Sequence, residues 1–169
     1  LSYQIMLNLV RANDIQSGCS ILDVGCGYVG FLKFINDIGN KGIDFHGIDV
    51  VQTMIEHAKN EFPGSNFMVG DIMDEHYNQK FDYVTCNGIF TQKLSTTDEE
   101  MNAFMKDLIY RMFELCNKGV AFNVMSTLVD FRTEGNFYKD PMEVFELASN
   151  LSRQVRIDHS YPLYEYTVY

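Results

Sequence analysis

The spacing of apolar positions changes several times along this chain, and each change predicts a different element. Short apolar runs bounded by turn-forming residues predict buried strands, whereas apolar residues three and four positions apart predict helices with one buried face. The expected strands cover 21–24, 43–49, 67–69, 81–86 and 119–125. The expected helices cover 2–11, 31–38, 54–62, 97–113 and 140–151. Strands and helices therefore alternate along most of the chain, which predicts a doubly wound α/β sheet.

Local signals refine three of these segments. Thr97 precedes Glu100 by three residues, the spacing of a capping box at a helix start. The segment 140–143 (Asp-Pro-Met-Glu) places proline at the first position of another helix. The tail 154–169 contains two β-rich runs joined by a Ser-Tyr-Pro turn, which predicts an antiparallel hairpin.

Composition narrows the class of protein. A chain of 169 residues with 46% apolar content is long enough for a single domain, which we expect to span 1–169. No apolar run approaches the roughly 18 residues of a membrane span, and no segment resembles a signal peptide, so we expect a cytoplasmic protein with no membrane partner. The four cysteines are far apart in sequence, which disfavours a metal site or a disulfide framework.

Charge narrows the kind of partner. The chain has 13 basic and 23 acidic side chains, and its net charge of −10 disfavours a partner held through many phosphates. We therefore expect no nucleic-acid partner and a small-molecule substrate.

The first expected strand ends in a glycine turn. Gly25 and Gly27 are separated by one residue and follow the apolar run directly, so the backbone can turn tightly and leave its N–H groups open to a ligand. With Gly30 they complete a G-x-G-x-x-G pattern, which is a weak signal by itself because such turns also join strands to helices with nothing bound. The informative residue is Asp23, a carboxylate two positions before the first glycine.

The segment from Asp23 to Gly27 resembles motif I of the class I S-adenosylmethionine (SAM) dependent methyltransferases. The resemblance implies SAM as the cofactor, with Asp23, Gly25 and Gly27 at its site. It also implies a Rossmann-like sheet of about seven mostly parallel strands, closed by a C-terminal antiparallel hairpin. One departure is that the family commonly has its third glycine where this chain has Val29, and here the glycine comes one residue later.

A second acidic residue follows the second expected strand. Asp49 lies 24 residues after Gly25 (49 − 25), close to the roughly 20-residue spacing at which a carboxylate reaches a ribose diol. We assign Asp49 and its neighbour Val50 to the cofactor site, the alternative being that Asp49 only caps the next helix. Replacing Asp49 by alanine is expected to weaken cofactor binding with little loss of fold stability.

The next two strands end in further candidate residues. Asp71 and Ile72 follow the third strand, where the resemblance implies contacts to the adenine ring, although a strand-ending Gly-Asp is also a common turn. Asn87 follows the fourth strand, where the family lines the methyl end of SAM. Phe90 lies just beyond it, and we expect it to contact the methyl acceptor.

The acceptor side has weaker signals. Direct methyl displacement needs alignment of the reacting atoms more than it needs an acid or a base, so we assign no catalytic residue. We expect acceptor recognition in the first helix, in the segment after the fourth strand and in the loop 126–139. Within that loop we select Ser126 and Arg132, the latter because a guanidinium suits an anionic acceptor.

Two other functions remain open from the residues alone. The literal glycine pattern also fits an NAD-dependent oxidoreductase, although Asp23 and the terminal hairpin disfavour it. A non-catalytic module of the same fold, binding SAM or a partner protein, is the alternative outside enzymes.

Overall fold

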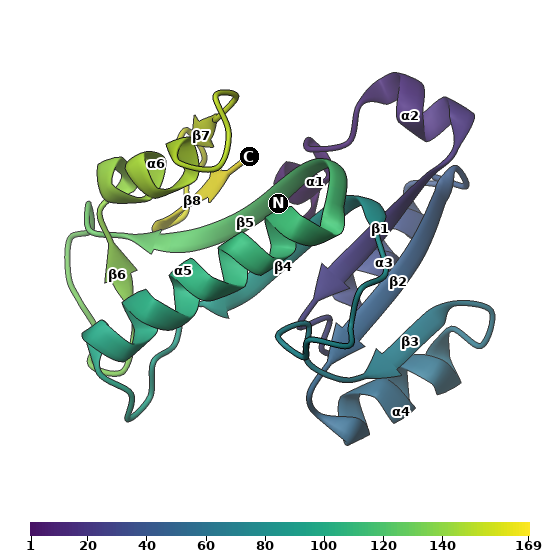
Figure 1. The fold of residues 1–169 in the computed structure, drawn as a ribbon, viewed down its shortest axis with the longest axis horizontal. Coiled ribbons are helices and arrows are strands. Elements are labelled where there is room, and N and C mark those ends of the chain that lie inside the picture. The colour runs from purple at the N-terminus through teal and green to yellow at the C-terminus, as the bar shows by residue number, and fades with distance from the viewer.

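The computed structural model describes residues 1–169 as one mixed sheet with helices on both faces (Figure 1). The strands are β1 (Cys19–Val24), β2 (Ile43–Asp49), β3 (Asn66–Val69), β4 (Phe81–Phe90), β5 (Cys116–Ser126), β6 (Tyr138–Lys139), β7 (Ile157–Asp158) and β8 (Glu165–Val168). The helices are α1 (Ser2–Leu7), α2 (Ala12–Ser17), α3 (Gly30–Asp37), α4 (Gln52–Glu61), α5 (Asp98–Leu115) and α6 (Pro141–Ser149). No helix is both long and apolar enough to cross a membrane.

The strand order confirms the predicted fold class. The sheet runs β3-β2-β1-β4-β5-β8-β7, and the short strand β6 also pairs with β5. Strands β1 to β6 pair in parallel, whereas β8 is antiparallel to both β5 and β7. The carboxyl ends of the parallel strands therefore share one edge of the sheet, which is where ligands of open α/β sheets bind.

Each face of the sheet has its own core. On one face, α5 and α6 cover the larger cluster, which includes Met105, Met112 and Phe122. On the other face, α1, α3 and α4 cover a second cluster, which includes Phe31 and Ile55. In Figure 1, α5 lies in front of β4 and β5, whereas α3 is largely hidden behind β1 and β2.

The two predicted helix starts are confirmed. The Thr97 hydroxyl accepts a hydrogen bond from the Glu100 N–H at 3.2 Å, and the Glu100 carboxylate accepts from the Thr97 N–H at 2.9 Å. At α6, Asp140 accepts from the N–H of Met142 at 2.7 Å, and Pro141 occupies the first helical position. Both caps satisfy N–H groups that the helix itself leaves unpaired.

The first expected helix is wrong in length. It ends at Leu7 rather than residue 11, and a separate helix, α2, follows at Ala12–Ser17. The physical reason is packing: Val10 is buried with the second core cluster, and Leu9 packs against Gly119 of β5. The chain therefore leaves the helix to bring both side chains onto the sheet.

The fourth strand continues past the predicted end at residue 86. Strand β4 passes through Asn87 and Gly88 to Phe90, with an irregular register between Cys86 and Phe90. Gly88 has a φ of +89°, a conformation that favours glycine, so the residues expected to end the strand instead form an irregularity within it.

Candidate functional site

The glycine turn joins β1 to α3 and contains two glycines with positive φ. Gly25 has a φ of +67° and Gly27 a φ of +50°, values that side chains rarely tolerate. The expectation of open N–H groups is wrong, however. The N–H groups of Gly25 and Cys26 donate to the Ile48 carbonyl at 2.8 and 3.2 Å, and the Gly27 N–H donates to Asp49 at 2.9 Å. The turn is held by β2, and at Gly25 the absence of a side chain leaves room for Ile89, which a Cβ would meet at 2.5 Å.

Asp49 links the glycine turn to the next helix. One carboxylate oxygen accepts from the Gly27 N–H, and the other accepts from the Val51 N–H at the start of α4, each at 2.9 Å. The capping role weighed as an alternative is therefore present. Because each carboxylate oxygen can accept more than one hydrogen bond, Asp49 can also accept from a ligand. Because of these two N–H contacts, we now expect a measurable loss of fold stability when this carboxylate is removed, rather than the little loss expected from the sequence.

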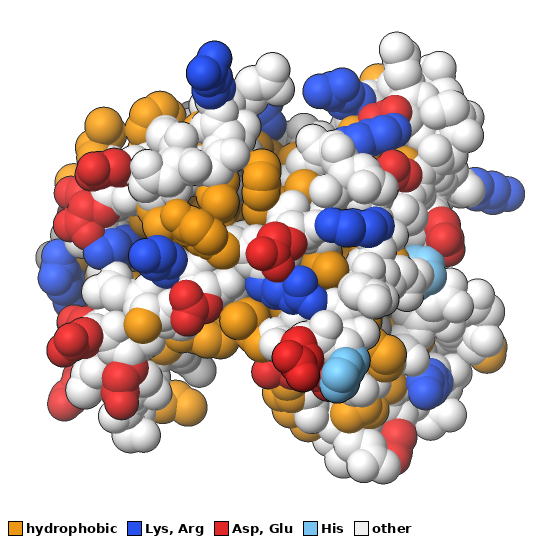
Figure 2. Space-filling view, viewed as in Figure 1, with side chains coloured by type: hydrophobic (Ala, Val, Ile, Leu, Met, Phe, Trp, Pro, Cys, Tyr) orange, Lys and Arg blue, Asp and Glu red, His pale blue; other side chains and the backbone are white.

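A cavity of about 610 Å³ opens at the carboxyl ends of β1, β2 and β4. It is lined by Val24, Gly25, Ile48, Asp49, Val50, Gly70, Asp71, Ile72, Asn87, Gly88, Ile89, Phe104 and Leu108. Figure 2 shows the surface notched between the side that carries α5 and the side that carries β3 and α4. The volume lies within the roughly 300–1,000 Å³ of small-molecule sites.

Six of the eight residues predicted to bind the cofactor line this cavity. These six are Gly25, Asp49, Val50, Asp71, Ile72 and Asn87. The other two, Asp23 and Gly27, belong to the same turn but lie outside the lining. The structure therefore brings together residues that are spread over more than sixty positions of the sequence.

Asp71 and Ile72 form the wall after β3. The Asp71 carboxylate accepts from the Met73 N–H at 2.9 Å, which fixes the turn, and the Ile72 side chain is buried. Arg111 of α5 holds this wall from behind: its Nε donates to the Ile72 carbonyl at 2.7 Å, and its guanidinium also donates to the Tyr77 carbonyl. Arg111 was not predicted as a site residue, because nothing in the local sequence connects it to a loop 39 residues away.

Asp23 is a buried carboxyl beneath the turn. It is 4% exposed, and the Thr85 hydroxyl donates to it at 2.9 Å. Burial raises the pKa of Asp23 to about 7, and the nearby Asp49 charge adds to this effect, although the Thr85 hydrogen bond opposes it. No cation pairs with this carboxyl within the protein, so its ionised form gains from a positive charge placed nearby.

Val29 and Gly30, where the glycine pattern departs from that of the family, have different roles in the structure. Val29, where the family commonly has glycine, adopts a left-handed φ of +52°, which is strained for a β-branched residue. Gly30 has a different role, because a Cβ there would lie 2.2 Å from the Tyr3 hydroxyl oxygen. The glycine at position 30 therefore lets α1 approach α3 closely.

A polar network that the sequence did not predict lies next to the cavity. The Ser2 hydroxyl contacts Asn87 Oδ1 at 3.1 Å and Glu165 Oε1 at 3.3 Å. The buried Asn123 donates to Glu165 Oε2 at 2.8 Å and accepts from the Gly88 N–H at 2.8 Å. These residues come from α1, β4, β5 and β8, so only the folded chain brings them together.

Two predicted acceptor residues have buried side chains. Phe90 is 0% exposed and packs edge to face against Phe104 and Phe122 in the core. Ser126 is also 0% exposed, and its hydroxyl accepts from the Leu128 N–H at 3.0 Å. Neither lines the cavity, and we correct both assignments: Phe90 belongs to the core, and Ser126 shapes the start of its loop.

The third predicted acceptor residue, Arg132, lies in a separate hollow. Its guanidinium lies over the Tyr138 ring, 5.4 Å from the centroid, in a recess of about 210 Å³. The loop that carries it is tied to the segment after β4, since the Phe137 N–H donates to the Thr91 carbonyl at 2.9 Å. Two of the three segments expected to surround the acceptor are therefore in contact with each other.

The cysteines are arranged for packing. All four are free thiols. Burial raises the pKa of Cys26 to about 12 and raises that of Cys86 further, so neither forms a thiolate nucleophile near neutral pH.

A glycine turn after β1, carboxylates after β2 and β3, and a last strand inserted antiparallel beside β5 together define the class I methyltransferase fold. Residues 15–165 match the model of a family described as "Methyltransferase domain". The chain belongs to this methyltransferase domain family.

Individual relatives agree with this assignment. The chain is 30% identical over 155 residues to "Putative methyltransferase Rv1506c" of Mycobacterium tuberculosis, covering 88% of this chain and 90% of that protein. Its fold is similar to that of a TehB-like SAM-dependent methyltransferase from Corynebacterium glutamicum, with a TM-score of 0.61 at 15% identity, covering 99% of this chain and 84% of that one. It is also similar to phosphoethanolamine N-methyltransferase 2 of Haemonchus contortus in complex with SAM, with a TM-score of 0.63 at 17% identity, covering 85% and 35% of the two chains.

Proposed function

We propose that this single-domain protein transfers a methyl group from SAM to a small molecule at the cavity beside the glycine turn. The observation that carries the proposal is the lining itself, where Asp49, Asp71 and Asn87 converge from three parallel strands. The structures of SAM-dependent methyltransferases with the same fold support SAM as the methyl donor.

The residues present fit this cofactor chemically. Asp49 can accept hydrogen bonds from two vicinal hydroxyls, and Asp71 can accept from the adenine amine. Apolar side chains, among them Ile72 and Leu108, form walls suited to a flat base. Asp23 adds an unpaired carboxyl one residue before the lining, which favours a cationic ligand such as SAM.

SAM supplies a methyl group on a positively charged sulfur, which leaves as a neutral thioether when a nucleophile attacks the methyl carbon. The contribution of this chain is to bind, orient and exclude water. The carboxylates would hold the nucleoside end, and Ile89, which packs directly against Gly25, belongs to the same lining. Fixing both reactants in line can provide much of the rate enhancement, with no acid or base required.

The acceptor in this proposal lies toward the network of Ser2, Asn87, Asn123 and Glu165. Asn87 belongs to both the network and the cavity lining, which makes it the link between the two. That Arg132 binds an anionic methyl acceptor stays a prediction. The net charge of −10 supports a small molecule over nucleic acid, and the four free cysteines support a cytoplasmic location.

The test is calorimetric titration of the purified protein with SAM, S-adenosylhomocysteine and NAD. We expect heat with the first two and none with NAD. The Asp49→Ala variant should bind S-adenosylhomocysteine about 5 to 150 times more weakly, equivalent to about 1–3 kcal/mol for lost charge-assisted hydrogen bonds. Asp44→Ala is the matched control, because Asp44 is an exposed carboxylate on the same strand and lies outside the cavity.

Two outcomes would contradict the proposal. Absence of binding at millimolar SAM would remove the cofactor assignment. Tight binding without methyl transfer to any member of a broad panel of hydroxyl, amine and thiol acceptors would favour a binding module instead.

A further inference from the structure

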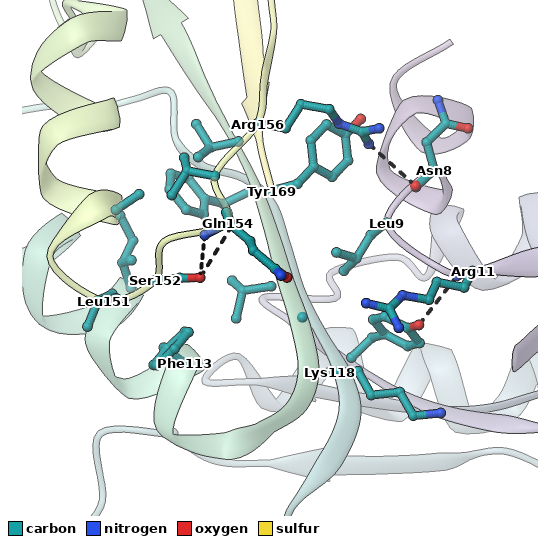
Figure 3. A pocket seen from close by; sticks show the side chains of 18 residues that line it. Asn8, Leu9, Arg11, Phe113, Lys118, Leu151, Ser152, Gln154, Arg156 and Tyr169 are labelled. Carbon is teal, nitrogen blue, oxygen red and sulfur yellow. Dashed lines mark hydrogen bonds between the residues drawn. The ribbon is translucent and has the colours of Figure 1, made fainter.

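A second cavity, of about 480 Å³, lies at the other end of the sheet. Tyr83 and Gly119, near the starts of β4 and β5, line it, whereas the proposed SAM cavity is lined by Asn87, Gly88 and Ile89 near the far end of β4. Its walls come from the last turns of α5, from the segment 151–156 after α6, and from residues 8–11 after α1. Figure 3 shows these three segments surrounding the hollow.

The hollow exists because β8 covers only part of the edge of β5. Their antiparallel pairing starts at Phe122, so the first residues of β5 have no strand beside them on that edge. The space is bounded by apolar side chains from different elements, including Leu9, Phe113, Val120, Leu151 and Val155. In Figure 2, hydrophobic side chains gather over the region between α5 and α6.

The charged residues at this cavity are all basic. Arg11, Lys118 and Arg156 line it, and none of the chain's 23 carboxylates does. In a protein of net charge −10, this local balance is opposite to that of the chain as a whole.

Two of these cations are free to bind an anion. Lys118 is already paired with Asp14 at 2.8 Å. Arg11 and Arg156 are exposed and have no carboxylate within ion-pair distance. Arg156 is held in place by its stacking on the Tyr169 ring, 3.9 Å from the centroid, and donates one long hydrogen bond to a backbone carbonyl, which leaves most of its N–H donors unused.

A neutral polar group completes the lining. Figure 3 shows the Gln154 side chain in the middle of the cavity, between Phe113 and Leu151 on one side and Lys118 and Arg11 on the other. The Gln154 side-chain amide has no hydrogen-bond partner, because the hydrogen bond to the Ser152 hydroxyl is donated by the Gln154 backbone N–H. The side-chain amide can therefore donate to or accept from a ligand.

We propose that this second cavity binds a small carboxylate that carries an apolar body. The apolar walls would cover the body, and the Arg11 and Arg156 guanidiniums would face the carboxylate, which their planar donors match in geometry. The volume suits a molecule of fragment to drug size. Asp14 and Asp158 lie close enough to Arg11 and Arg156 for their charges to interact, but they form no ion pair with these guanidiniums, whose donors therefore stay available to a ligand. A cationic ligand should bind poorly, because the lining has two guanidiniums without an ion pair and no Asp or Glu side chain.

Octanoate is the probe, and octan-1-ol and octylammonium are its neutral and cationic counterparts with the same chain. Each is titrated into the 15N-labelled protein at about 0.15 M salt, where distant charges are screened, while amide shifts are followed. We expect octanoate to bind at least ten times more tightly than either counterpart, with the largest shifts at residues 8–11, 118–120 and 152–156. Equal affinity for the three probes, absence of saturation at 5 mM octanoate, or shifts centred on the SAM cavity would each overturn the proposal.

Substitutions then test the cations. The double variant Arg11→Gln and Arg156→Gln should weaken octanoate binding about tenfold or more while leaving octan-1-ol binding unchanged. Arg153→Gln is the matched control, because Arg153 is an exposed arginine of the same segment that does not line the cavity. Arg11→Gln alone, which removes no side-chain hydrogen bond or ion pair, should weaken octanoate binding severalfold in a protein with an unchanged spectrum. If it and the double variant bind octanoate as Arg153→Gln does, the proposal is wrong. SAM binding plays no part in this readout, so the result is independent of the proposed function.

Discussion

Replacing Asp23 by asparagine should remove a pH dependence from the stability of this protein. Asp23 is 4% exposed, accepts one hydrogen bond from Thr85, and has its pKa raised by burial to about 7. Asparagine has nearly the same shape and can accept the same hydrogen bond, but it cannot ionise. The substitution therefore isolates the cost of placing a negative charge at this position.

The magnitude follows from the difference between the folded and unfolded pKa. An unfolded aspartate ionises at a pKa of about 3.9, so from about pH 5 to 7 the unfolded chain is ionised while the folded chain retains the proton. Because the folded pKa is the higher one, the stability contributed by protonated Asp23 is fully present below the unfolded pKa. It is lost as pH rises through the folded pKa. In that interval each pH unit removes about 1.4 kcal/mol, and the total from pH 5 to pH 8 is about 2–3 kcal/mol.

The assay is urea unfolding of both proteins at half-unit steps from pH 5 to pH 8. The free energy of unfolding of Asp23→Asn minus that of the wild type should increase by about 2–3 kcal/mol across this range. Other titrating groups cancel in this difference, and stopping at pH 8 avoids the thiols. Asp107→Asn, at an exposed carboxylate of α5, should give a flat difference. A flat difference for Asp23→Asn as well, or one that decreases with pH, would refute the argument.

Three further predictions concern single contacts. Asp49→Ala should lower the free energy of unfolding by about 1–3 kcal/mol in urea titrations without ligand, because the Gly27 and Val51 N–H groups lose a charged acceptor; an unchanged value would mean that water replaces it fully. Thr97→Ala should cost about 1 kcal/mol by loss of the α5 cap, measured by thermal unfolding against Thr96→Ala as the control. Arg111→Leu should speed amide exchange in residues 72–77 and weaken S-adenosylhomocysteine binding in calorimetry, and normal exchange in this loop would show that the guanidinium does not hold it.

The sequence predicted the fold class, and it predicted that most of the proposed cofactor residues lie together, because both depend on short-range patterns. Apolar runs alternating with helical patterns predicted the parallel strands. A recognisable glycine or aspartate stands at or just after the ends of three of them, as at Gly25, Asp49 and Asp71. In a parallel sheet the carboxyl ends of neighbouring strands meet at one edge. Residues with no sequence proximity could therefore be assigned to one site, and six of the eight do line the same cavity.

The position of Phe90 was predicted less well because it depends on strand register. The five residues of β4 from Cys86 to Phe90 lie beside only three residues of β5, from Phe122 to Val124. This irregularity draws Phe90 back over the core instead of past the edge of the sheet, where the sequence had placed it. Nothing in the local pattern around Gly88 fixes how many residues the irregularity absorbs.

Other features exist only through long-range contacts. Glu165 meets Asn123 because β8 pairs with β5 in one particular register, and Arg111 reaches the loop after β3 because α5 packs across the sheet. The second cavity likewise results from where the pairing of β8 with β5 starts. The spacing of residues along the chain determined which side chains end the strands, whereas strand register and helix packing decided which distant side chains share a site, because those depend on the total packing of both cores.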